Sequence, residues 1–312
     1  MKKYAFGADI GGTTIKLGLF ETLGNLIEVW EIPTRIEENG KYILIDIAAS
    51  IEEKLKEKKI SKLDVEGIGM GVPGPVGRDG NVLKCVNLGW GVFNVEKEMT
   101  TLTGFKAKAG NDANVAALGE MWQGGGKGYS DIVMVTLGTG VGGGIIINGK
   151  ILTGENGAGG EIGHMCVNLE ETDTCGCGGH GCLEQYASAT GISRLARKKM
   201  EHETRATILT KEDLSAKAVF DAVKEGDEVA TEVATEMGNY LGHAMADMAA
   251  VLDPAVFVIG GGVSKAGEVL LSFIEKPFME KAFFANKNVK FKLATLGNDA
   301  GICGAAKLVL ED

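Results

Sequence analysis

The sequence predicts an α/β protein built from two similar lobes, and three observations lead there. Residues 9–18 (DIGGTTIKLG) reappear in altered form at 135–144 (VTLGTGVGGG), and residues 110–119 (GNDANVAALG) resemble 297–306 (GNDAGICGAA). Two weak repeats in the same order indicate a duplicated unit. The length of 312 residues also suits two lobes, because single cores stop growing near about 250–300 residues.

The N-terminal half alternates predicted strands and helices. Residues 4–20 are expected to form a strand, a Gly-Gly turn and a second strand, and residues 26–33 a third strand. Apolar residues at helical spacing predict a helix at 39–60, with a solvated Lys/Glu face. A buried strand at 65–71 then ends in a Gly/Pro loop, and a helical run follows at 114–122. This alternation is typical of an α/β lobe.

The second half is predicted to repeat this plan with longer connections. It is expected to contain, in order, a loop at 147–160, the segment 161–184, a helix at 187–200, charged helical sequence without evident chemistry at 201–240, and a buried strand at 256–262. We place a small N-terminal lobe at residues 1–112, completed by a C-terminal helix at about 299–312, and a large C-terminal lobe with a zinc site at 113–298.

The composition is that of an ordinary globular protein with one outlier. Hydrophobic residues make up 45% of the chain and charged residues 24%, both near the usual values. The net charge of −10 argues against nucleic acid as a partner, because phosphate contacts need a basic face. An anionic substrate would need a local positive potential or a metal ion. Glycine is the outlier, since 47 residues is about twice the average of about 7%, which predicts many tight turns and close backbone approaches to ligands.

The cysteines and the apolar runs predict a cytoplasmic protein. Three of the six cysteines form one cluster and the other three are scattered in apolar surroundings, so we expect a reducing compartment and no disulfide framework. The N-terminal apolar run is interrupted at Asp9, which is not the pattern of a signal peptide. The longest apolar stretch, 248–263, is broken by Asp253 and Pro254, so no membrane span is expected.

The segment EIGHMCVNLEETDTCGCGGHGCLE carries the densest chemical signal of the chain. Cys175, Cys177 and Cys182 form a C-x-C-x4-C cluster on a Gly-rich loop, and His164 lies eleven residues upstream. Three thiolates and one imidazole suit a tetrahedral structural Zn²⁺. His180 is the alternative fourth ligand, because it lies inside the loop and the spacing gives His164 only a modest advantage.

Two carboxylates, Glu161 and Glu184, flank the cysteine cluster. Neither is a good zinc ligand when three thiolates are present, so both are free to bind something else. A carboxylate can accept hydrogen bonds from two adjacent hydroxyls. We therefore predict that a metal-pinned backbone presents Glu161, His164 and Glu184 to a small polyhydroxy substrate.

A phosphate-binding turn is predicted where the first two strands meet. Gly11 and Gly12 let backbone N–H groups approach an anion, and Thr13 and Thr14 add hydroxyl donors. Asp9, at the end of the strand, is placed to hold Mg²⁺ directly or through water. An ordinary hairpin is the alternative interpretation of the same residues.

The second half carries a matching turn. Gly138 and Thr139 align with the first Gly-Thr pair in the repeat, so the two turns are expected to serve one nucleoside triphosphate. Gly260, Gly261 and Gly262 follow the buried strand and would bring the backbone flat against adenine. A crowded strand-to-helix turn explains these three glycines equally well.

Together, the motifs DIGGTT, GNDANVAALGE, LGTGVGGG, EIGH and CGCGGHGCLE resemble the ROK family of sugar kinases and sugar-responsive repressors, essentially end to end. The combination is highly specific, although no single motif is. The resemblance implies a duplicated actin/hexokinase-like ATPase fold, two lobes with a central cleft, which agrees with the internal repeat. Within the family, the stretch CGCGGHGCLEQYASATG is most similar to bacterial ATP-dependent glucokinases.

The resemblance assigns a role to each motif residue. Asp112, whose position alone is as well explained by a helix N-cap, would be the base toward the sugar 6-hydroxyl. His164 would bind zinc through one ring nitrogen and sugar through the other. The remaining assignments are sugar hydroxyls for Asn111, Asp112, Glu161 and Glu184; phosphates for Gly11, Gly12, Thr13, Thr14, Gly138 and Thr139; Mg²⁺ for Asp9; and adenosine for Gly260, Gly261 and Gly262.

The resemblance thus implies ATP-dependent phosphorylation of glucose at its 6-hydroxyl, with Mg²⁺ accompanying ATP and Zn²⁺ as a structural ion. A kinase for another sugar, such as N-acetylmannosamine or fructose, and a catalytically silent sugar sensor are the alternatives, and polyphosphate or ADP as donor is left open. Only eight residues precede Asp9, so we expect no helix-turn-helix arm. Members of the family commonly pair, so we expect a homo-oligomer, a dimer.

Overall fold

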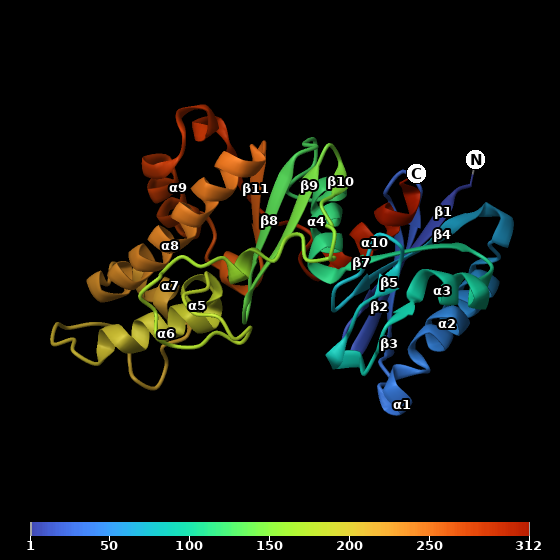
Figure 1. Ribbon diagram of the computed structural model, residues 1–312, viewed down its shortest axis with the longest axis horizontal. Coiled ribbons are helices and arrows are strands. Elements are labelled where there is room, and N and C mark those ends of the chain that lie inside the picture. Colours follow the sequence, from blue (N-terminus) through green and yellow to red (C-terminus); the bar gives the residue numbers. More distant parts are fainter. Residues whose placement is uncertain (1, 312) are drawn as a thin grey trace. The chain divides into compact units, whose positions relative to one another are not determined.

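The first of two five-stranded sheets is built almost entirely from the N-terminal third of the chain. In a computed structural model that describes residues 2–311, this sheet has the strand order β3-β2-β1-β4-β7 (Figure 1). The strands are β1 (Tyr4–Ile10), β2 (Thr14–Glu21), β3 (Leu26–Pro33), β4 (Val65–Val72) and β7 (Lys106–Asn111). β2 lies antiparallel to both β1 and β3, whereas β4 lies parallel to both β1 and β7. The predicted hairpin and third strand are confirmed.

The second sheet repeats the order of the first. It runs β10-β9-β8-β11-β12, so that each strand has a counterpart at the same place in the first sheet. Its strands are β8 (Ile132–Leu137), β9 (Val141–Ile147), β10 (Lys150–Ile151), β11 (Val256–Gly260) and β12 (Lys290–Leu293). The predicted duplication is therefore confirmed. A small additional sheet pairs β5 (Asn81–Val82) with β6 (Phe93–Asn94).

Helices follow the strands at corresponding positions of the two repeats. They are α1 (Glu37–Gly40), α2 (Ile43–Lys58), α3 (Val95–Thr103), α4 (Asp112–Gln123), α5 (Glu184–Ala187), α6 (Ala189–Met200), α7 (Ala216–Lys224), α8 (Glu228–Leu252), α9 (Glu268–Lys281) and α10 (Ala300–Leu310). α4 follows β7 as α10 follows β12. Within the described residues, no helix is both long enough and apolar enough to span a membrane.

Two predicted helical stretches are shorter in the structure. The helix expected at 39–60 begins only at Ile43, because Glu38 and Asn39 adopt left-handed backbone conformations with φ of 51° and 59°. The helical sequence expected at 201–240 is irregular up to Ser215, where α7 is capped. The prediction for 201–215 is therefore wrong. This segment is held by side chains instead, with Asp227 accepting hydrogen bonds from Thr207 and from the Ile208 N–H.

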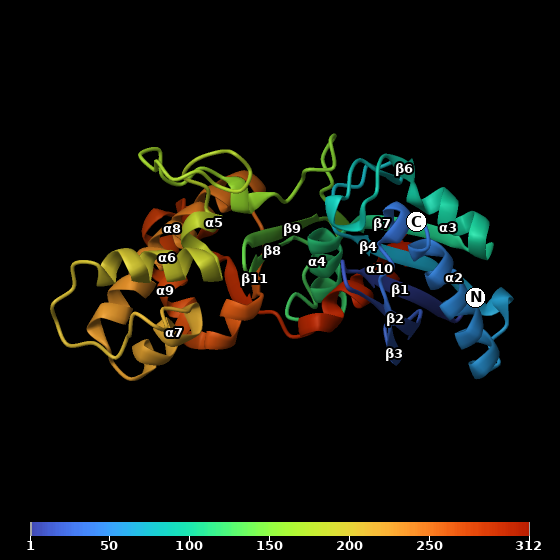
Figure 2. The ribbon, with the colours of Figure 1, turned by 90° about the horizontal axis from the view of Figure 1, so that it is seen from below.

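The chain divides into two compact units. The first runs up to Ser130 and includes Gly144–Gly160 and the segment from Leu296 on, and the second comprises Asp131–Gly143 and Glu161–Thr295. Helix α4 lies in the first unit because it packs against α10. The lobe boundary predicted after residue 112 concerns the functional lobes and stays a prediction. In the second unit, α8 packs against α6, α7 and α9 (Figure 2).

The central strands β1 and β4 of the first sheet are buried on both faces, which explains their nearly continuous apolar sequences. On one face, Phe6, Ala8 and Ile10 of β1 belong to a core that includes Ile47 and Ile51 of α2. On the other face, the alternate β1 residues meet α10 in a smaller core of Ala5, Phe20, Ile302, Cys303, Ala306 and Val309. The C-terminal helix α10 therefore contributes to the core of the N-terminal sheet.

Helix α10 approaches its neighbours so closely that only glycine fits at the contacts. A Cβ atom at Gly69 of β4 would overlap the carbonyl oxygen of Ala305, and one at Gly7 of β1 would overlap that of Ile302. The contact between α4 and α10 is equally tight, because a Cβ at Gly304 would overlap the carbonyl oxygen of Val115. These atoms belong to the backbone, so no side-chain rotation relieves the overlap.

Replacement of Gly304 by alanine tests this packing. Gly304→Ala should lower the melting temperature by roughly 2–8 °C, because overpacking costs about 1–3 kcal/mol and exceeds the roughly 1 kcal/mol that alanine gains over glycine in a helix. Thermal unfolding followed by circular dichroism measures the change. Gly91→Ala is the matched control, since a Cβ there meets nothing within 4 Å. Equal melting temperatures for the two variants would contradict the tight contact.

Candidate functional site

The predicted zinc ligands lie together in the second unit. The sulfur atoms of Cys175, Cys177 and Cys182 and a ring nitrogen of His164 are all within 4.8 Å of one another. The nitrogen is Nδ1, at 3.9 Å from the Cys175 sulfur. His180, the alternative ligand, instead places its own Nδ1 3.2 Å from the carbonyl oxygen of Asp173. The geometry thus favours His164 as the fourth ligand.

The three thiols of this cluster differ in their pKa values. Burial raises the pKa of Cys175, and burial together with the neighbouring thiols raises that of Cys182 to about 12. In contrast, the Gly179 N–H and the other thiols lower the pKa of Cys177. Without a cation, the three thiols are therefore not all ionised together. A divalent ion such as Zn²⁺ would change this, because it deprotonates the thiols that coordinate it. One imidazole and three thiols form a donor set that suits Zn²⁺.

A set of polar residues that the sequence analysis missed anchors the loop before the cysteines. The Arg194 guanidinium forms ion pairs with Glu171 and Asp173 and donates to the Gln185 carbonyl at 3.2 Å. Burial opposes the ionisation of Glu171, but hydrogen bonds from Tyr186 and Arg194 lower its pKa to about 2. These partners lie at distant positions in the sequence, so no local motif reveals them.

Glu184 links the metal cluster to the turn between β8 and β9. Its Oε1 accepts from the Cys175 thiol at 3.3 Å, and its Oε2 accepts from the Val141 N–H at 3.3 Å. A Cβ at Gly140 would overlap the same Oε2, so glycine in this turn makes room for the carboxylate. A hollow of about 460 Å³ opens here, and Thr139, Gly140, Cys175 and Glu184 are among the residues that line it.

Glu161 and His164 lie on a short turn that packs against β9. Glu161 precedes the 3₁₀ turn Ile162–His164, and both of their side chains are exposed. Gly163, between them, lies so close to the Val141 carbonyl that a Cβ would overlap it. In the second unit, the structure therefore brings Glu161, His164 and Glu184 to the neighbourhood of one residue, Val141.

The two glycine turns of the second unit lie side by side. Gly261 has a φ of 83°, and a Cβ there would meet the carbonyl oxygen of Leu137 at 2.5 Å, just before the Gly138 turn. Gly262, in contrast, faces open space, since nothing lies within 4 Å of its Cβ position. It lines a hollow of about 370 Å³ whose other walls are Ala189, Ser215, Ala216, Lys217, Phe220, Asp221, Lys224, Val263, Lys265 and Ala266.

Most of that lining was missed by sequence reasoning. Ser215, Lys217 and Phe220 belong to the 201–240 stretch in which no chemistry was evident. They reach the hollow because α7 packs against the short helix that follows Gly261. The pattern of α7 indicates only an amphipathic helix, so the signal becomes visible only when its neighbour is known.

In the first unit, Asn111 and Asp112 lie where β7 ends and α4 begins. The Asn111 side chain caps the helix, accepting from the N–H groups of Ala113 at 3.0 Å and Asn114 at 3.2 Å. The interpretation of Asp112 as the N-cap is therefore wrong, because Asn111 serves that role. Asp112 is the first residue of the helix and is partly exposed.

Asp9 and Asp112 face each other across Gly71. A Cβ at Gly71 would lie 3.4 Å from Asp9 Oδ1 and 3.7 Å from the Asp112 Cα. Burial, followed by repulsion from Asp112, raises the pKa of Asp9 to about 6, while Lys16 acts in the opposite direction. Two such carboxylates in one place suit a bound cation, because a cation stabilises both ionised forms.

The turn after Asp9 is a hairpin whose outer residues are open. The Gly11 N–H donates to the Thr14 carbonyl at 3.1 Å, and the Thr34 hydroxyl donates to the Gly11 carbonyl at 2.7 Å. Gly12, Thr13 and Thr14 are exposed, which leaves the Gly12 backbone and the threonine hydroxyls accessible to a ligand. The hairpin interpretation and the phosphate prediction are therefore compatible.

Comparison with known proteins places this site in a family. A sequence model described as the ROK family matches residues 5–312. The chain belongs to the ROK family. Among its relatives, a glucokinase of Halalkalibacterium halodurans is 43% identical over 99% of this chain and 96% of its own length. A xylose repressor of Caldicellulosiruptor bescii is 28% identical over 98% of this chain and 78% of its own length.

A solved structure of the ROK family extends the comparison to the fold. The ROK family glucokinase from Streptomyces griseus, in complex with glucose and AMPPNP, has a TM-score of 0.73 and 33% identity, and it covers 98% of each chain. The actin/hexokinase-like fold implied by the sequence motifs is thereby confirmed.

The metal cluster generates a direct prediction. Cys177→Ser should lower the zinc content from about one ion per chain to a small fraction of that, and it should lower the melting temperature, because structural zinc contributes to folding. Mass spectrometric metal analysis and thermal unfolding provide the two measurements.

Cys166→Ser is the matched control for this prediction. Cys166 is exposed and lies outside the group of four ligands, so this variant should keep the metal and the melting temperature. If both variants retained the metal equally, Cys177 would not be a ligand.

Proposed function

We propose that this chain catalyses ATP-dependent phosphorylation of glucose at its 6-hydroxyl to give glucose 6-phosphate. The observation that carries the proposal is the end-to-end likeness to glucokinases, with 43% identity over 99% of the chain in one case. The glycine turns support it, since Gly12-Thr13 and Gly138-Thr139 occur at matching places of the two repeats. Phosphoryl transfer needs positioning and charge stabilisation more than covalent chemistry by the protein.

In the first unit, Asp112 is proposed to act as the base. Its backbone is fixed because Asn111 caps α4 immediately before it, and its carboxylate would accept the proton of the sugar 6-hydroxyl. Asn111 would contribute to sugar binding. Asp9 would hold Mg²⁺, which supplies neutralisation of phosphate charge when it is bound with ATP. The open hairpin at Gly11, Gly12, Thr13 and Thr14 would donate to the phosphates.

In the second unit, Glu161, His164 and Glu184 are proposed to accept hydrogen bonds from the sugar hydroxyls. His164 places Nδ1 toward the cysteines, which leaves Nε2 available for the sugar. The four ligands His164, Cys175, Cys177 and Cys182 would hold Zn²⁺, and the metal would supply rigidity rather than chemistry at the sugar. Glu184 would be positioned through its neighbour Cys175.

The hollow beside Gly262 is proposed to accommodate the adenine ring. Its walls include the Phe220 and Val263 side chains together with the stems of lysines, which is the mainly apolar lining that suits a flat base. Gly260 and Gly261 would bring the backbone close to the adenosine. Gly138 and Thr139, which lie next to this turn, would reach the phosphates.

Two further properties belong to this proposal. All six cysteines are free thiols, which supports a reducing, cytoplasmic compartment. A homodimer is proposed because members of the family commonly pair, and size-exclusion chromatography with light scattering measures it directly.

A coupled assay with ATP, Mg²⁺ and a panel of sugars tests the activity. Glucose should be phosphorylated faster than N-acetylmannosamine or fructose, and Asp112→Asn should lower kcat by about 10²–10⁴-fold, because the base is lost. Turnover of another sugar in preference to glucose would favour a different sugar kinase, and no turnover of any sugar would favour a sensor.

Asp299→Asn is the matched control for the base, because Asp299 occupies the equivalent place in the second repeat. Its carboxylate pairs with Lys16 at 2.5 Å, so this variant should keep most of the activity. A loss of turnover in Asp299→Asn with normal turnover in Asp112→Asn would overturn the assignment.

The adenine hollow is tested by filling it. Gly262→Leu should raise the KM for ATP at least tenfold while the KM for glucose changes little, because the new side chain occupies open space that the adenine needs. Gly91→Leu, at another position with nothing within 4 Å, should leave both constants unchanged. An unaltered KM for ATP in Gly262→Leu would place the adenine elsewhere.

A further inference from the structure

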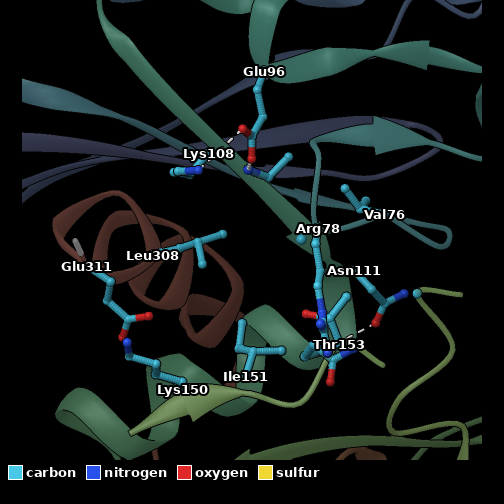
Figure 3. Close-up of a pocket in the computed structure, with 15 residues that line it drawn as sticks. Val76, Arg78, Glu96, Lys108, Asn111, Lys150, Ile151, Thr153, Leu308 and Glu311 are labelled. Atoms are coloured by element: carbon cyan, nitrogen blue, oxygen red, sulfur yellow. Dashed lines mark hydrogen bonds and ion pairs between the residues drawn. The ribbon is translucent and has the colours of Figure 1, made fainter. Parts of the chain in front are cut away.

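A separate cavity lies within the first unit, on the outer side of β7 (Figure 3). It has a volume of about 380 Å³. Its walls are the loop at Val76–Arg78, the edge strand β7, the end of β10 with the loop that follows it, and the last turn of α10. The volume is sufficient for a small metabolite.

Three cationic side chains line this cavity, although the chain as a whole has a net charge of −10. Lys108 is partly neutralised by Glu96 at 3.5 Å. Within residues 2–311, Arg78 and Lys150 take part in no ion pair. Arg78 reaches down beside Thr153, and Lys150 extends from the opposite side of the cavity (Figure 3). Arg78 thus faces this space with no anionic partner among the described residues, whereas Lys150 lies within electrostatic reach of Glu311.

The carboxylates around the cavity are already engaged. Glu96 accepts from the Ala109 N–H at 3.0 Å in addition to its ion pair with Lys108. Glu311 lies 3.7 Å from Lys307. Burial raises the pKa of Glu311, and both Lys307 and Lys150 oppose that rise. Three cationic side chains and two carboxylates thus line the cavity, so its local charge is positive.

A buried amide at the inner wall lacks a hydrogen-bond donor. Asn114 is only 3% exposed, and its nitrogen donates to the Gly159 carbonyl at 3.0 Å. Its oxygen is buried and has no partner among the described residues. An unsatisfied buried polar atom costs about 1–3 kcal/mol. Since Asn114 lines the cavity, a molecule bound there is in a position to supply the missing donor.

We propose that this cavity binds a small phosphate ester that carries hydroxyl groups. Arg78 and Lys150 would hold the phosphate, because guanidinium and ammonium groups form charge-assisted hydrogen bonds with it. A hydroxyl of the ligand would donate to the Asn114 oxygen, and the Thr153 side chain offers a second polar contact. An anion without a hydroxyl group, such as sulfate, would satisfy the two cations but would leave the amide without a donor.

The position of the cavity connects it to the catalytic proposal. Asn111 and Asn114 both line it, and they flank Asp112 in the first turn of α4. A bound ester therefore contacts the turn that carries the proposed base. Hexose phosphates belong to the proposed ligand class, so the product of the proposed reaction is a suitable probe. Binding itself does not depend on the proposed function, since it is measured without turnover.

Calorimetric titration of the full chain tests the site. Glucose 6-phosphate is added without ATP and in the presence of saturating glucose, which blocks binding at the proposed sugar site. One site should remain, and Arg78→Gln and Lys150→Gln should each weaken binding about tenfold, as expected for the loss of one charge-assisted contact. Lys211→Gln, an exposed lysine of the second unit, is the control and should bind normally.

Other outcomes would overturn the proposal. These are the absence of binding, complete displacement by glucose, and equal affinity in the wild type and both cavity variants. Sulfate, which has no hydroxyl group, would overturn the assignment of a hydroxylated ester if it bound as tightly as glucose 6-phosphate. A protein that phosphorylated no sugar but still bound the ester in an Arg78-dependent manner would refute the proposed function alone.

Discussion

The close packing of α10 against β1, β4 and α4 is the constraint on which the rest of the first unit depends. The last helix of the chain returns to cover the first sheet, and it lies so near that backbone meets backbone at Gly7, Gly69 and Gly304. This contact orients α4, whose first residue is Asp112. The position of the proposed base is therefore set by a helix almost two hundred residues away in the sequence. The contacts that set it are between backbone atoms, so no side-chain rotation relieves them.

In the second unit, the candidate ligands are held in place in a different way. Its candidate ligands lie on loops and short turns, which by themselves would hold side chains loosely. The cysteine cluster, the Arg194 network and the close contact of Gly163 with Val141 replace regular secondary structure there. Glu184 touches both Cys175 and the β8–β9 turn. A change in the cysteine cluster would consequently reach the proposed sugar ligands and the proposed phosphate turn together.

The two repeats share one strand order but differ in the residues around their equivalent aspartates. Asp112 and Asp299 stand at equivalent places, yet Asp299 is engaged by Lys16 whereas Asp112 lies next to the partly buried Asp9. The insertions also differ, since only the second repeat contains the cysteine loop and α6 to α8. The duplicated fold thus supplies two similar glycine turns, and the insertions in the second repeat make the surroundings of the two turns different.

The sequence by itself determined the N-terminal strands, the duplication, the cluster of three cysteines and the family. Each of these leaves a local signature, because alternation, glycine spacing and cysteine spacing are properties of neighbouring residues. Only the tertiary structure decided that Asn111 rather than Asp112 caps α4, that His164 rather than His180 joins the cysteines, and that residues 201–215 are irregular. It also showed that Phe220 and Lys217 line the hollow beside Gly262 and that Arg78, Lys150 and Asn114 share a cavity. Such groupings join residues from different elements, so their physical cause is packing between distant segments.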